Sequence, residues 1–328
     1  MPSPRAPATT LAVDVGGTHM RTALVDEEGK VLLRRSLPTP RRAEVPAALT
    51  DLIRSVALGG DAGRPAAAEA VVGLPGPVDY RSGRLLWAPH LPETWAAQLS
   101  ERQLSEQVGM AVRLANDADL AAVGEAYFGS GHDHGDIGSG RDHGDIAFLT
   151  ISTGIGAGVV VGGRLVFASR SLAELGHTII DRDAWEAGRP ATLEELASGS
   201  GLTRMAAEAG LGALDGEGVE DLFSSGHPAA VRIWNGAVAA ASIGVTNLAW
   251  SFCPRLVVIG GGLGRRPAFY DALRATVERR APVGLPEISL ALSSLGDDAG
   301  LVGAARWSEA VPVPPPGTPG AEPSRPLP

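Results

Sequence analysis

Two stretches of the chain, residues 11–25 and residues 147–161, each combine a short apolar run, a turn of glycine and threonine, and a second short run. Short apolar runs on either side of a glycine-rich turn are typical of paired β-strands. The turns contain Gly16, Gly17 and Thr18 in the first stretch and Thr153, Gly154 and Gly156 in the second. The pattern therefore predicts two β-hairpins with glycine-rich turns.

The rest of the chain alternates between strand and helix patterns. Short apolar runs predict strands at residues 70–73, 111–114 and 256–259. Helical periodicity predicts helices near residues 43–56, 94–108, 229–252, 267–280 and 299–309, and another after Leu193. Strands that alternate with helices indicate a layered α/β fold.

The length of 328 residues exceeds the size of most single cores, so we expect two domains with a cleft between them. After a disordered start at residues 1–10, we expect a smaller α/β domain at 11–115, which the helix at 299–309 rejoins, and a larger α/β domain at 116–298. Residues 311–328 hold eight prolines and few apolar anchors, which predicts a disordered tail.

Composition excludes some classes of protein. A formal net charge of -9 and the lack of any Lys/Arg cluster argue against a nucleic-acid-binding surface. The N-terminus lacks the apolar core of a signal peptide and no apolar run is long enough to cross a membrane, so we expect a cytoplasmic protein with no membrane partner. The single cysteine, Cys253, excludes an internal disulfide, and its apolar neighbours predict a buried structural thiol.

Both glycine turns are candidates for phosphate binding. Glycines let a tight turn bring backbone N–H groups close to an anion, and a threonine hydroxyl adds a donor. Two such turns facing one cleft would suit a nucleoside triphosphate. The P-loop pattern with its Lys-Ser/Thr ending is absent from both turns. Neither turn shows the dinucleotide-binding pattern of a strand, Gly-x-Gly-x-x-Gly and a helix, and a strand rather than a helix follows Thr18. Plain hairpin turns are the alternative, since glycine and threonine are common in them.

Asp117 is a candidate general base for phosphoryl transfer to a hydroxyl group. It follows the strand at 111–114 and begins a helix, where the partial positive charge of the backbone favours a carboxylate. Helix capping is the alternative, with Asn116 as the N-cap and Asp117 in the first turn. We expect Asp119 and Glu125, which follow in the same segment, to be surface or helix residues.

Other polar residues offer further chemistry. Glu174 and His177 lie three residues apart after the second hairpin, where they could bind sugar hydroxyls or form a structural pair. Residues 130–145 carry a local duplication that contains His132, His134 and His143. These histidines could bind a metal, but a slipped repeat in a solvated loop explains them more simply.

Six motifs then follow one another in a fixed order: residues 14–21, 73–79, 116–125, 153–158, 174–177 and 259–262. Their sequences include Asp-Val-Gly-Gly-Thr, Gly-Leu-Pro-Gly-Pro-Val-Asp, Asn-Asp-Ala-Asp and Glu-Leu-Gly-His. Over residues 11–309 the series resembles the ROK family of sugar kinases and repressors. The resemblance implies an α/β fold of two ribonuclease-H-like domains, of the actin and hexokinase type, with sugar and ATP in the interdomain cleft.

The resemblance implies ATP-dependent phosphorylation of a hexose, with glucose as the expected acceptor, and a homodimer. Other acceptors stay open, namely fructose, mannose, N-acetylmannosamine and N-acetylglucosamine, as does polyphosphate as donor. Repressors of the family carry a helix-turn-helix module ahead of the first hairpin, and only ten residues precede Leu11 here. A sugar-binding protein without turnover is a further alternative.

The resemblance also assigns roles to single residues. Asp117 matches the catalytic aspartate of the family. The sugar contacts would come from Asn116, Asp117, Glu174, His177, Glu194 and Gly76. For Gly76 the alternative is that it merely forms a rigid turn. Phosphate contacts would come from the two glycine turns, and the contacts to adenosine from Gly261 and Gly262. Asp14 would hold Mg²⁺ through water.

The chain departs from the family between His177 and Glu194. Most members have a cysteine-rich zinc knuckle there, whereas residues 185–193 read Trp-Glu-Ala-Gly-Arg-Pro-Ala-Thr-Leu. Structural zinc needs four ligands, so His177 alone cannot hold it and we predict no structural zinc. We expect Trp185 and its apolar neighbours to pack this loop instead, and the loss of the metal could weaken sugar binding.

Overall fold

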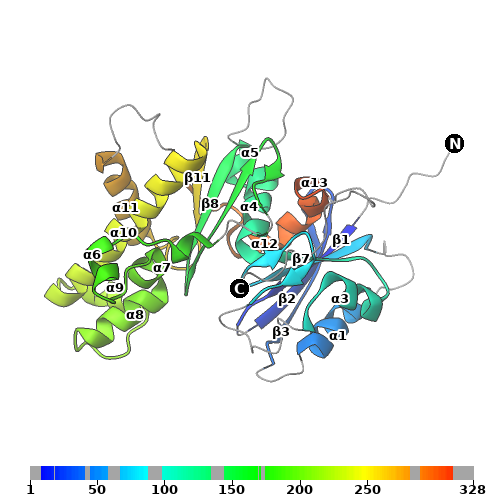
Figure 1. Cartoon of the computed structure of the whole chain (residues 1–328), viewed down its shortest axis with the longest axis horizontal. Helices are drawn as coiled ribbons and strands as arrows, with labels where there is room; N and C mark the ends of the chain where they lie inside the picture. The colour runs from blue at the N-terminus through cyan, green and yellow to red at the C-terminus, as the bar shows by residue number, and fades with distance from the viewer. Residues whose placement is uncertain are drawn as a thin grey trace. The chain divides into compact units, whose positions relative to one another are not determined.

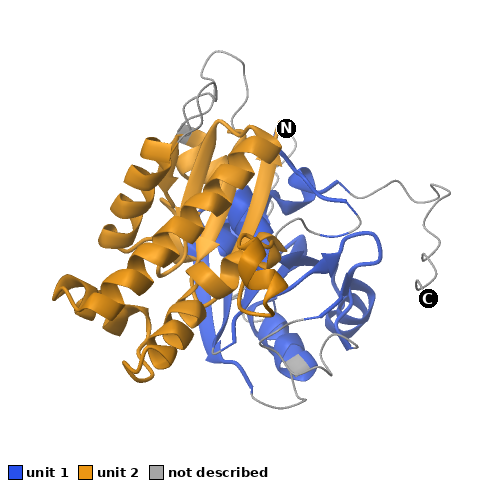
Figure 2. Cartoon of the chain, turned by 60° about the vertical axis from the view of Figure 1, so that its left-hand side comes forward, with its two compact units in different colours: residues 1–124, 163–171, 298–328 blue, residues 125–162, 172–297 orange. Residues whose placement is uncertain are grey.

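The computed structural model describes residues 9–17, 19–40, 45–57, 67–87, 98–133, 144–168, 170, 174–280 and 289–312. The chain forms two compact units, which Figure 2 shows in blue and orange. Unit 1 comprises residues 1–124, 163–171 and 298–328, and unit 2 comprises residues 125–162 and 172–297. The domain boundary near residue 116 stays a prediction; the two units divide helix α4 (Asp117–Phe128) after Gly124.

A five-stranded sheet forms the centre of unit 1 (Figure 1). Its order is β3-β2-β1-β4-β7, from β1 (Thr9–Val15), β2 (His19–Asp26), β3 (Val31–Pro38), β4 (Glu69–Leu74) and β7 (Val112–Asn116). The first three strands are antiparallel, whereas β1, β4 and β7 run parallel. Parallel strands end at the same edge of a sheet, so the sequence segments that follow β1, β4 and β7 lie at one edge of unit 1.

Short elements complete unit 1. Helices α1 (Val45–Ala57) and α3 (Glu101–Val108) pack against each other, and α12 (Ala299–Gly303) contacts β1 and β2. A two-stranded sheet joins β5 (Val78–Asp79) to β6 (Arg84–Leu85). The helix predicted at 299–309 is three pieces: α12, the 3-10 turn η3 (Ala304–Arg306) and α13 (Trp307–Ala310).

Unit 2 repeats the same arrangement of strands. Its strands have the order β9-β8-β11-β12, from β8 (Ile146–Ile151), β9 (Ile155–Val161), β11 (Leu256–Gly260) and β12 (Leu290–Leu292), while β10 (Arg164–Leu165) belongs to unit 1. The hairpin β8–β9 is antiparallel, and β11 runs parallel to both β8 and β12. Every residue of β11 is buried, as expected for a strand between two parallel neighbours.

Helices account for most of unit 2. The longest is α10 (Pro228–Phe252), which contacts α7 (Leu193–Ala197), α8 (Gly199–Glu208), α9 (Gly216–Ser224) and α11 (Pro267–Arg280). Trp234 of α10 is fully buried, stacks on Phe223 and meets Phe269 edge to face. The smaller elements are α5 (Ser130–Asp133), the 3-10 turns η1 (Glu174–His177) and η2 (Gly296–Asp298), and α6 (Arg182–Glu186).

Helix α4 is buried along most of its length, and small residues make this possible. Within unit 1, a Cβ atom on Gly124 would overlap the carbonyl oxygen of Ala299, and one on Gly303 would overlap the carbonyl oxygen of Leu120. Glycine at these two positions lets the backbones of α4 and α12 approach closely. The first turn of α4 is therefore held against a fixed neighbour.

Two acidic residues of α4 are buried. Asp119 and Glu125 are helix residues, as one of the two expectations had it, but both are 0% exposed, so they are not surface residues. Glu125 accepts hydrogen bonds from the backbone N–H of Ser130 at 2.9 Å and of Leu295 at 3.0 Å, and from the Ser293 hydroxyl at 2.5 Å. A carboxylate can be buried when several donors replace its water, and two of these donors, Ser293 and Leu295, come from a segment far from α4 in the sequence.

The expectation about the single cysteine is wrong. Cys253 is exposed, because it is the C-cap of α10 and lies beyond the last buried turn, in a left-handed conformation with φ 46°. The disordered tail at 311–328 stays a prediction, because residues 313–328 lie outside the described residues; Val311, at its start, is 2% exposed and its N–H donates to the Trp307 carbonyl oxygen.

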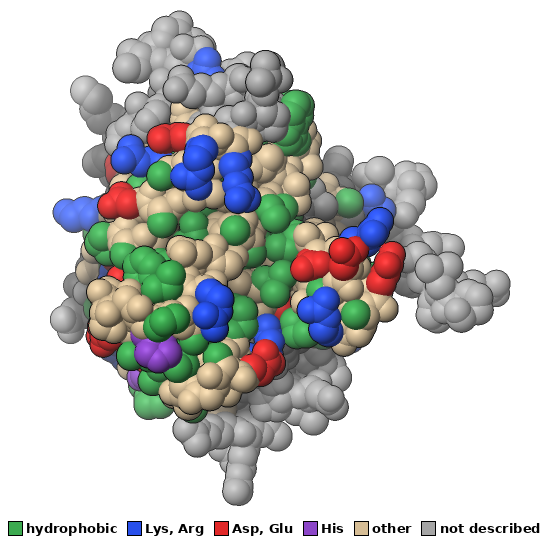
Figure 3. All heavy atoms as spheres, turned by 90° about the vertical axis from the view of Figure 1, so that its left-hand side faces the viewer, with side chains coloured by type: hydrophobic (Ala, Val, Ile, Leu, Met, Phe, Trp, Pro, Cys, Tyr) green, Lys and Arg blue, Asp and Glu red, His purple; other side chains and the backbone are tan. Residues whose placement is uncertain are grey.

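The surface carries charges of both signs. On the face in Figure 3, lysine and arginine side chains lie singly or in small groups among apolar and neutral side chains. No helix in the described ranges combines the length and apolar character that crossing a membrane requires.

We predict that Gly303→Ala lowers the free energy of unfolding by about 1–3 kcal/mol, because the added methyl must push α12 away from α4. The control is Gly236→Ala on α10, where a Cβ would meet nothing within 4 Å. That variant should be as stable as wild type or gain up to about 1 kcal/mol from helix propensity. Urea unfolding followed by circular dichroism measures both, and equal stability of the two variants would contradict the packing argument.

Candidate functional site

The first glycine turn joins β1 to β2 at the edge of the unit 1 sheet. The Gly16 N–H donates to the His19 carbonyl oxygen at 2.9 Å, and a Cβ on Gly16 would lie 3.0 Å from that oxygen. The Thr39 hydroxyl donates to the Gly16 carbonyl oxygen at 2.6 Å. The turn is thus fixed by its own hairpin and by one residue beyond β3, and Gly17 is exposed at its tip. Thr18 lies outside the described residues.

Asp14 is paired with a residue that the sequence analysis did not single out. In the β1–β2 register Asp14 lies opposite Arg21, whose guanidinium donates to Asp14 Oδ2 from Nη2 and, at 3.0 Å, from Nε. The Asp14 side chain is 21% exposed and that of Arg21 is 32% exposed. An opposite-charge pair placed symmetrically about a predicted hairpin turn was the signal that could have identified Arg21.

Asn116 and Asp117 form the junction between β7 and α4. The Asn116 Oδ1 atom accepts from the N–H of Ala118 at 2.9 Å and of Asp119 at 3.2 Å, and its Nδ2 donates to the Gly76 carbonyl oxygen at 3.0 Å. Asn116 is 4% exposed and caps the helix, while Asp117 is exposed in the first turn. The capping interpretation of Asn116 is therefore confirmed, and only one N–H of its amide is left to meet a ligand.

Gly76 lies at the same edge of the unit 1 sheet. Its φ of 131° is a conformation that favours glycine, and its carbonyl oxygen is the acceptor for Asn116. The register pairs Asp14 with Gly73 and Leu74 with Asn116. Unit 1 therefore places Asp14, Gly16, Gly76, Asn116 and Asp117 at the ends of three adjacent parallel strands.

The second glycine turn joins β8 to β9 in unit 2. The Gly199 N–H donates to the Ser152 carbonyl oxygen at 2.7 Å, and the Ser200 N–H donates to the Thr153 carbonyl oxygen at 3.1 Å, so the start of α8 is tied to this turn. Thr153 is exposed.

The turn after β11 lies beside it. A Cβ on Gly261, which has a φ of 80°, would overlap the backbone of Ile151, and the Leu263 N–H donates to the Ile151 carbonyl oxygen at 3.0 Å. A Cβ on Gly262 would meet nothing within 4 Å, so this glycine faces open space. The two turns thus form one glycine-rich edge of unit 2, as the pairing of Gly260 with Thr150 requires.

Glu174, His177 and Glu194 gather next to the second glycine turn. The Glu194 Oε2 atom accepts from the Ile155 N–H at 2.7 Å, and a Cβ on Gly154 would lie 2.6 Å from that oxygen. In η1, His177 Nε2 lies 3.4 Å from Glu174 Oε2. A Cβ on Gly176 would lie 2.5 Å from the Ile155 carbonyl oxygen and 3.3 Å from Glu194 Cβ, so η1 packs closely on β9 and α7. The cluster offers several oxygen acceptors and one imidazole to a polyhydroxyl ligand.

Backbone pairing and a capping box hold the segment between η1 and α7. Ile179 pairs with Thr192, and the Ile180 N–H donates to the Ala191 carbonyl oxygen at 2.9 Å. Glu195 Oε2 accepts from the N–H groups of Thr192 and Ala191, both at 3.0 Å, and these two bonds hold the pKa of the Glu195 carboxyl below its ordinary value. Trp185 does not pack this loop as expected, because it is 58% exposed on α6.

Metal ligands are not clustered in the described part of the chain. No group of three or more His, Cys, Asp or Glu side chains there could hold a metal ion. His132 is described and exposed, while His134 and His143 lie outside the described residues, as does most of the duplicated segment.

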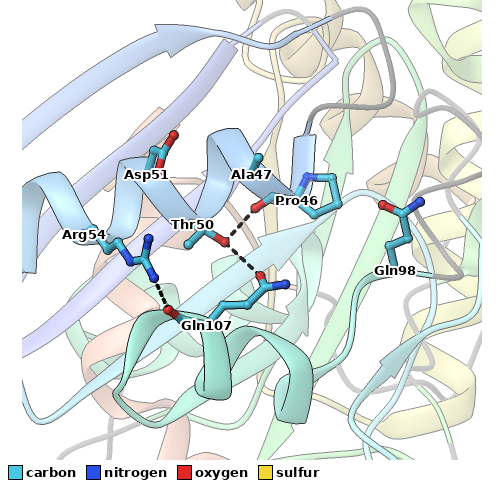
Figure 4. A pocket seen from close by; sticks show the side chains of 7 residues that line it. All are labelled: Pro46, Ala47, Thr50, Asp51, Arg54, Gln98 and Gln107. Atoms are coloured by element: carbon cyan, nitrogen blue, oxygen red, sulfur yellow. Dashed lines mark hydrogen bonds between the residues drawn. The ribbon is translucent and has the colours of Figure 1, made fainter.

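A pocket of about 420 Å³ on unit 1 lies between α1 and α3 (Figure 4). The Thr50 hydroxyl lies 3.0 Å from Gln107 Oε1, and the Arg54 guanidinium donates to the Gln107 carbonyl oxygen. Thr50 and Arg54 thus both bind Gln107, and none of the predicted site residues lines the pocket.

The fold resembles that of solved structures of known proteins. A crystal structure of a ROK family glucokinase from Streptomyces griseus, in complex with glucose and AMPPNP, is similar with a TM-score of 0.70 and 30% identity, over 91% of this chain and 98% of that one. The chain therefore has the actin and hexokinase type of α/β fold. A sequence model described as "ROK family" matches residues 10–311, and the chain belongs to the ROK family.

Curated relatives of two kinds are similar over most of their length. A glucokinase of Streptomyces coelicolor is 31% identical, over 90% of this chain and 96% of the relative. An N-acetylmannosamine kinase of Citrobacter koseri is also 31% identical, over 90% of this chain and 97% of the relative. The relatives are sugar kinases that differ in their sugar.

Because the folded state lowers the pKa of Glu195 below its ordinary value of 4.5, this carboxylate stabilises the fold above about pH 4.5 and stops doing so as pH falls through the lower folded pKa. We predict that Glu195→Gln flattens the acid limb of a plot of melting temperature against pH. Glu208→Gln, at an exposed carboxylate of α8 that pairs with Arg204, is the control and should keep the wild-type limb. Superimposable acid limbs for Glu195→Gln and wild type would contradict this role.

Proposed function

We propose that this ROK-family sugar kinase transfers the γ-phosphoryl group of ATP to the 6-hydroxyl of a hexose, with glucose as the preferred acceptor. The observation that carries the proposal is the exposed carboxylate of Asp117 in the first turn of α4, next to a buried asparagine cap. Phosphoryl transfer needs positioning, charge neutralisation and one base rather than extensive covalent chemistry. A fixed, accessible carboxylate supplies that base.

In the proposed reaction, the hexose 6-oxygen forms a bond to the γ-phosphorus while the bond from that phosphorus to ADP breaks. The hydroxyl proton passes to an oxygen of Asp117, which is therefore the catalytic residue. The position of Asp117 at a helix N-terminus supports this role, because the helix dipole favours the carboxylate form that accepts a proton. The family resemblance of residues 116–125 supports the same assignment.

We propose that the sugar is bound by Asn116, Asp117 and Gly76 of unit 1 and by Glu174, His177 and Glu194 of unit 2. The support is that each set is grouped within its own unit. Asn116 would contribute its one remaining amide N–H, and Glu194 its Oε1, since Oε2 is engaged by Ile155. Hydroxyl groups need dense and directional hydrogen bonding of this kind.

We propose that the glycine turns bind the ATP phosphates through Gly16, Gly17 and Thr18 and through Thr153, Gly154 and Gly156, with Gly261 and Gly262 next to adenosine. The open space at Gly262 fits a ligand that approaches the backbone. Asp14 would hold Mg²⁺ through water, and the ion would neutralise phosphate charge. Mg²⁺ in such sites needs only one or two carboxylates beside phosphates and water, which Asp14 can satisfy although Arg21 engages its Oδ2.

N-acetylmannosamine is the second candidate acceptor, because an N-acetylmannosamine kinase is as similar to this chain as a glucokinase is. Small changes in a pocket redirect specificity between such sugars. The set of Glu174, His177 and Glu194 resembles that of glucokinases, which supports glucose.

The test is an assay of ADP release with Mg-ATP against a panel of hexoses and N-acetylhexosamines, with and without a zinc-selective chelator. We predict turnover that depends on glucose and does not respond to the chelator, because the segment between His177 and Glu194 is held by backbone bonds and a capping box. Preference for another sugar would replace the acceptor and keep the mechanism. A silent panel with measurable sugar binding would contradict the kinase proposal and favour a binding protein or another donor such as polyphosphate.

The matched variant is Asp117→Asn, which keeps the size of the side chain and its place in the helix. Loss of the base should lower kcat by about 100-fold to 10,000-fold while sugar binding, measured by calorimetry, persists. Near-normal turnover would show that Asp117 is not the base.

We also propose that the chain forms a homodimer through unit 2. Ile243 and Trp250 lie seven residues apart on α10, two helical turns on one face, and are 38% and 52% exposed. Exposed apolar side chains grouped in this way are typical of interfaces between proteins.

We predict that light scattering after gel filtration gives the mass of a dimer for wild type and of a monomer for Trp250→Glu, since a buried carboxylate would oppose association. Leu37→Glu, at an apolar residue of unit 1 that is 44% exposed, is the control and should remain dimeric. A monomeric wild type would contradict the proposal.

A further inference from the structure

We propose that Tyr80 and Asp119 are a positioning pair that fixes the start of α4 and thereby aims Asp117. This inference rests on the proposed function, because it adds two residues to the same reaction. Neither residue needs to touch the sugar or ATP. Both act through the junction at Asn116 and Asp117.

The pair is built around one hydroxyl group. The Tyr80 hydroxyl donates to Asp119 Oδ2 at 2.6 Å and accepts from the Asn116 N–H at 3.1 Å. Tyr80 follows β5 and is 8% exposed, and Asp119 is 0% exposed. A single oxygen atom therefore links the last residue of β7 to the first turn of α4, on either side of Asp117 in the sequence.

The hydrogen bond between the Tyr80 hydroxyl and the Asp119 carboxylate fixes the direction in which the hydroxyl donates. A hydroxyl bond to a carboxylate is charge-assisted and stronger than a bond between neutral groups. Because the Asp119 carboxylate is buried, losing a donor would leave it with an uncompensated desolvation cost. The Tyr80 hydroxyl is thus held toward Asp119, and its lone pair is presented to the Asn116 N–H.

The tyrosine ring is held separately from its hydroxyl. It meets the Phe167 ring edge to face at 5.3 Å between centroids and the Trp307 ring at 5.5 Å. A phenylalanine at position 80 would keep these contacts and lose only the hydroxyl. This separation allows positioning to be tested apart from packing.

Positioning matters here because Asp117 is exposed while its neighbours are buried. Asn116 and Asp119 are 4% and 0% exposed, so the backbone on both sides of Asp117 is anchored inside unit 1. A general base must stand within hydrogen-bond reach of the proton that it accepts, and a displacement of about 1 Å can cost about 100-fold in rate. The hydroxyl of Tyr80 limits such displacement.

The experiment compares Tyr80→Phe with Tyr270→Phe. Tyr270 is the matched control because its hydroxyl also makes a hydrogen bond, to the Leu290 carbonyl oxygen at 3.2 Å, in α11 of unit 2. We expect Tyr80→Phe to lower kcat about tenfold and to leave the KM for ATP within about twofold, in keeping with a misplaced base. Tyr270→Phe should keep the wild-type kcat.

Hydrogen exchange gives a readout that does not need activity. In Tyr80→Phe the backbone amides at residues 116–119 should exchange about tenfold faster or more, because Asn116 loses its acceptor and the cap of α4 loosens. In Tyr270→Phe these amides should exchange as in wild type. Wild-type exchange in Tyr80→Phe would overturn the proposal, as would faster exchange with an unchanged kcat.

A double-mutant cycle tests whether Tyr80 and Asp119 act as a pair or independently. Asp119→Asn and Tyr80→Phe act through one contact, so the combined variant should lose less activity than the product of the two single losses. Additive losses would overturn the pairing. Should wild type phosphorylate no sugar, the proposed function would fail, while the exchange rates at 116–119 would still decide whether Tyr80 anchors the junction.

Discussion

The burial of helix α4 is the constraint on which the candidate site depends. Gly124 and Gly303 let α4 and α12 approach at backbone distance, so α4 cannot shift along its axis without a clash. Its first turn must then begin where β7 ends, at Asn116, whose side chain caps the helix. Asp117 in this turn is exposed, and its Oδ1 atom accepts from the Ala118 N–H at 2.8 Å, so the carboxylate is tied to the same junction.

Buried carboxylates are the second recurring feature. Glu125 receives donors from α5 and from the segment after β12, and Asp119 receives the Tyr80 hydroxyl. Each buried carboxylate needs partners, and the Ser293 and Tyr80 hydroxyls come from parts of the chain far from α4. These bonds connect α4 to the segment after β5 and to the segment after β12.

In unit 2, the sugar-binding candidates and the glycine turn are parts of one structure. Glu194 rests on Gly154 and accepts from the Ile155 N–H, while η1 packs on the same backbone through Gly176. A change in the β8–β9 turn would therefore move the Glu194 carboxylate, and a change of Glu194 would move this turn. The capping box of Glu195 and Thr192 anchors α7 next to them, in a segment where most family members are expected to use metal.

The sequence determined the two hairpins and the alternation of strands with helices, because periodicity is a local property. It also determined the family, because the order of the motifs can be read directly along the chain. Helix α11 has the predicted bounds, and α10 starts within one residue of its prediction. The Asn116 cap also followed from residue type and spacing. These features depend on neighbours in the chain and on little else.

Only the tertiary structure decided which polar groups are buried and which apolar groups are not. Asp119 and Glu125 are helix residues that are enclosed, and Trp185 and Cys253 are exposed although they were expected to be packed or buried. The Tyr80 hydroxyl meets residues 36 and 39 positions away. Such contacts leave no local periodicity, because burial of a charge depends on donors that the chain brings back from afar.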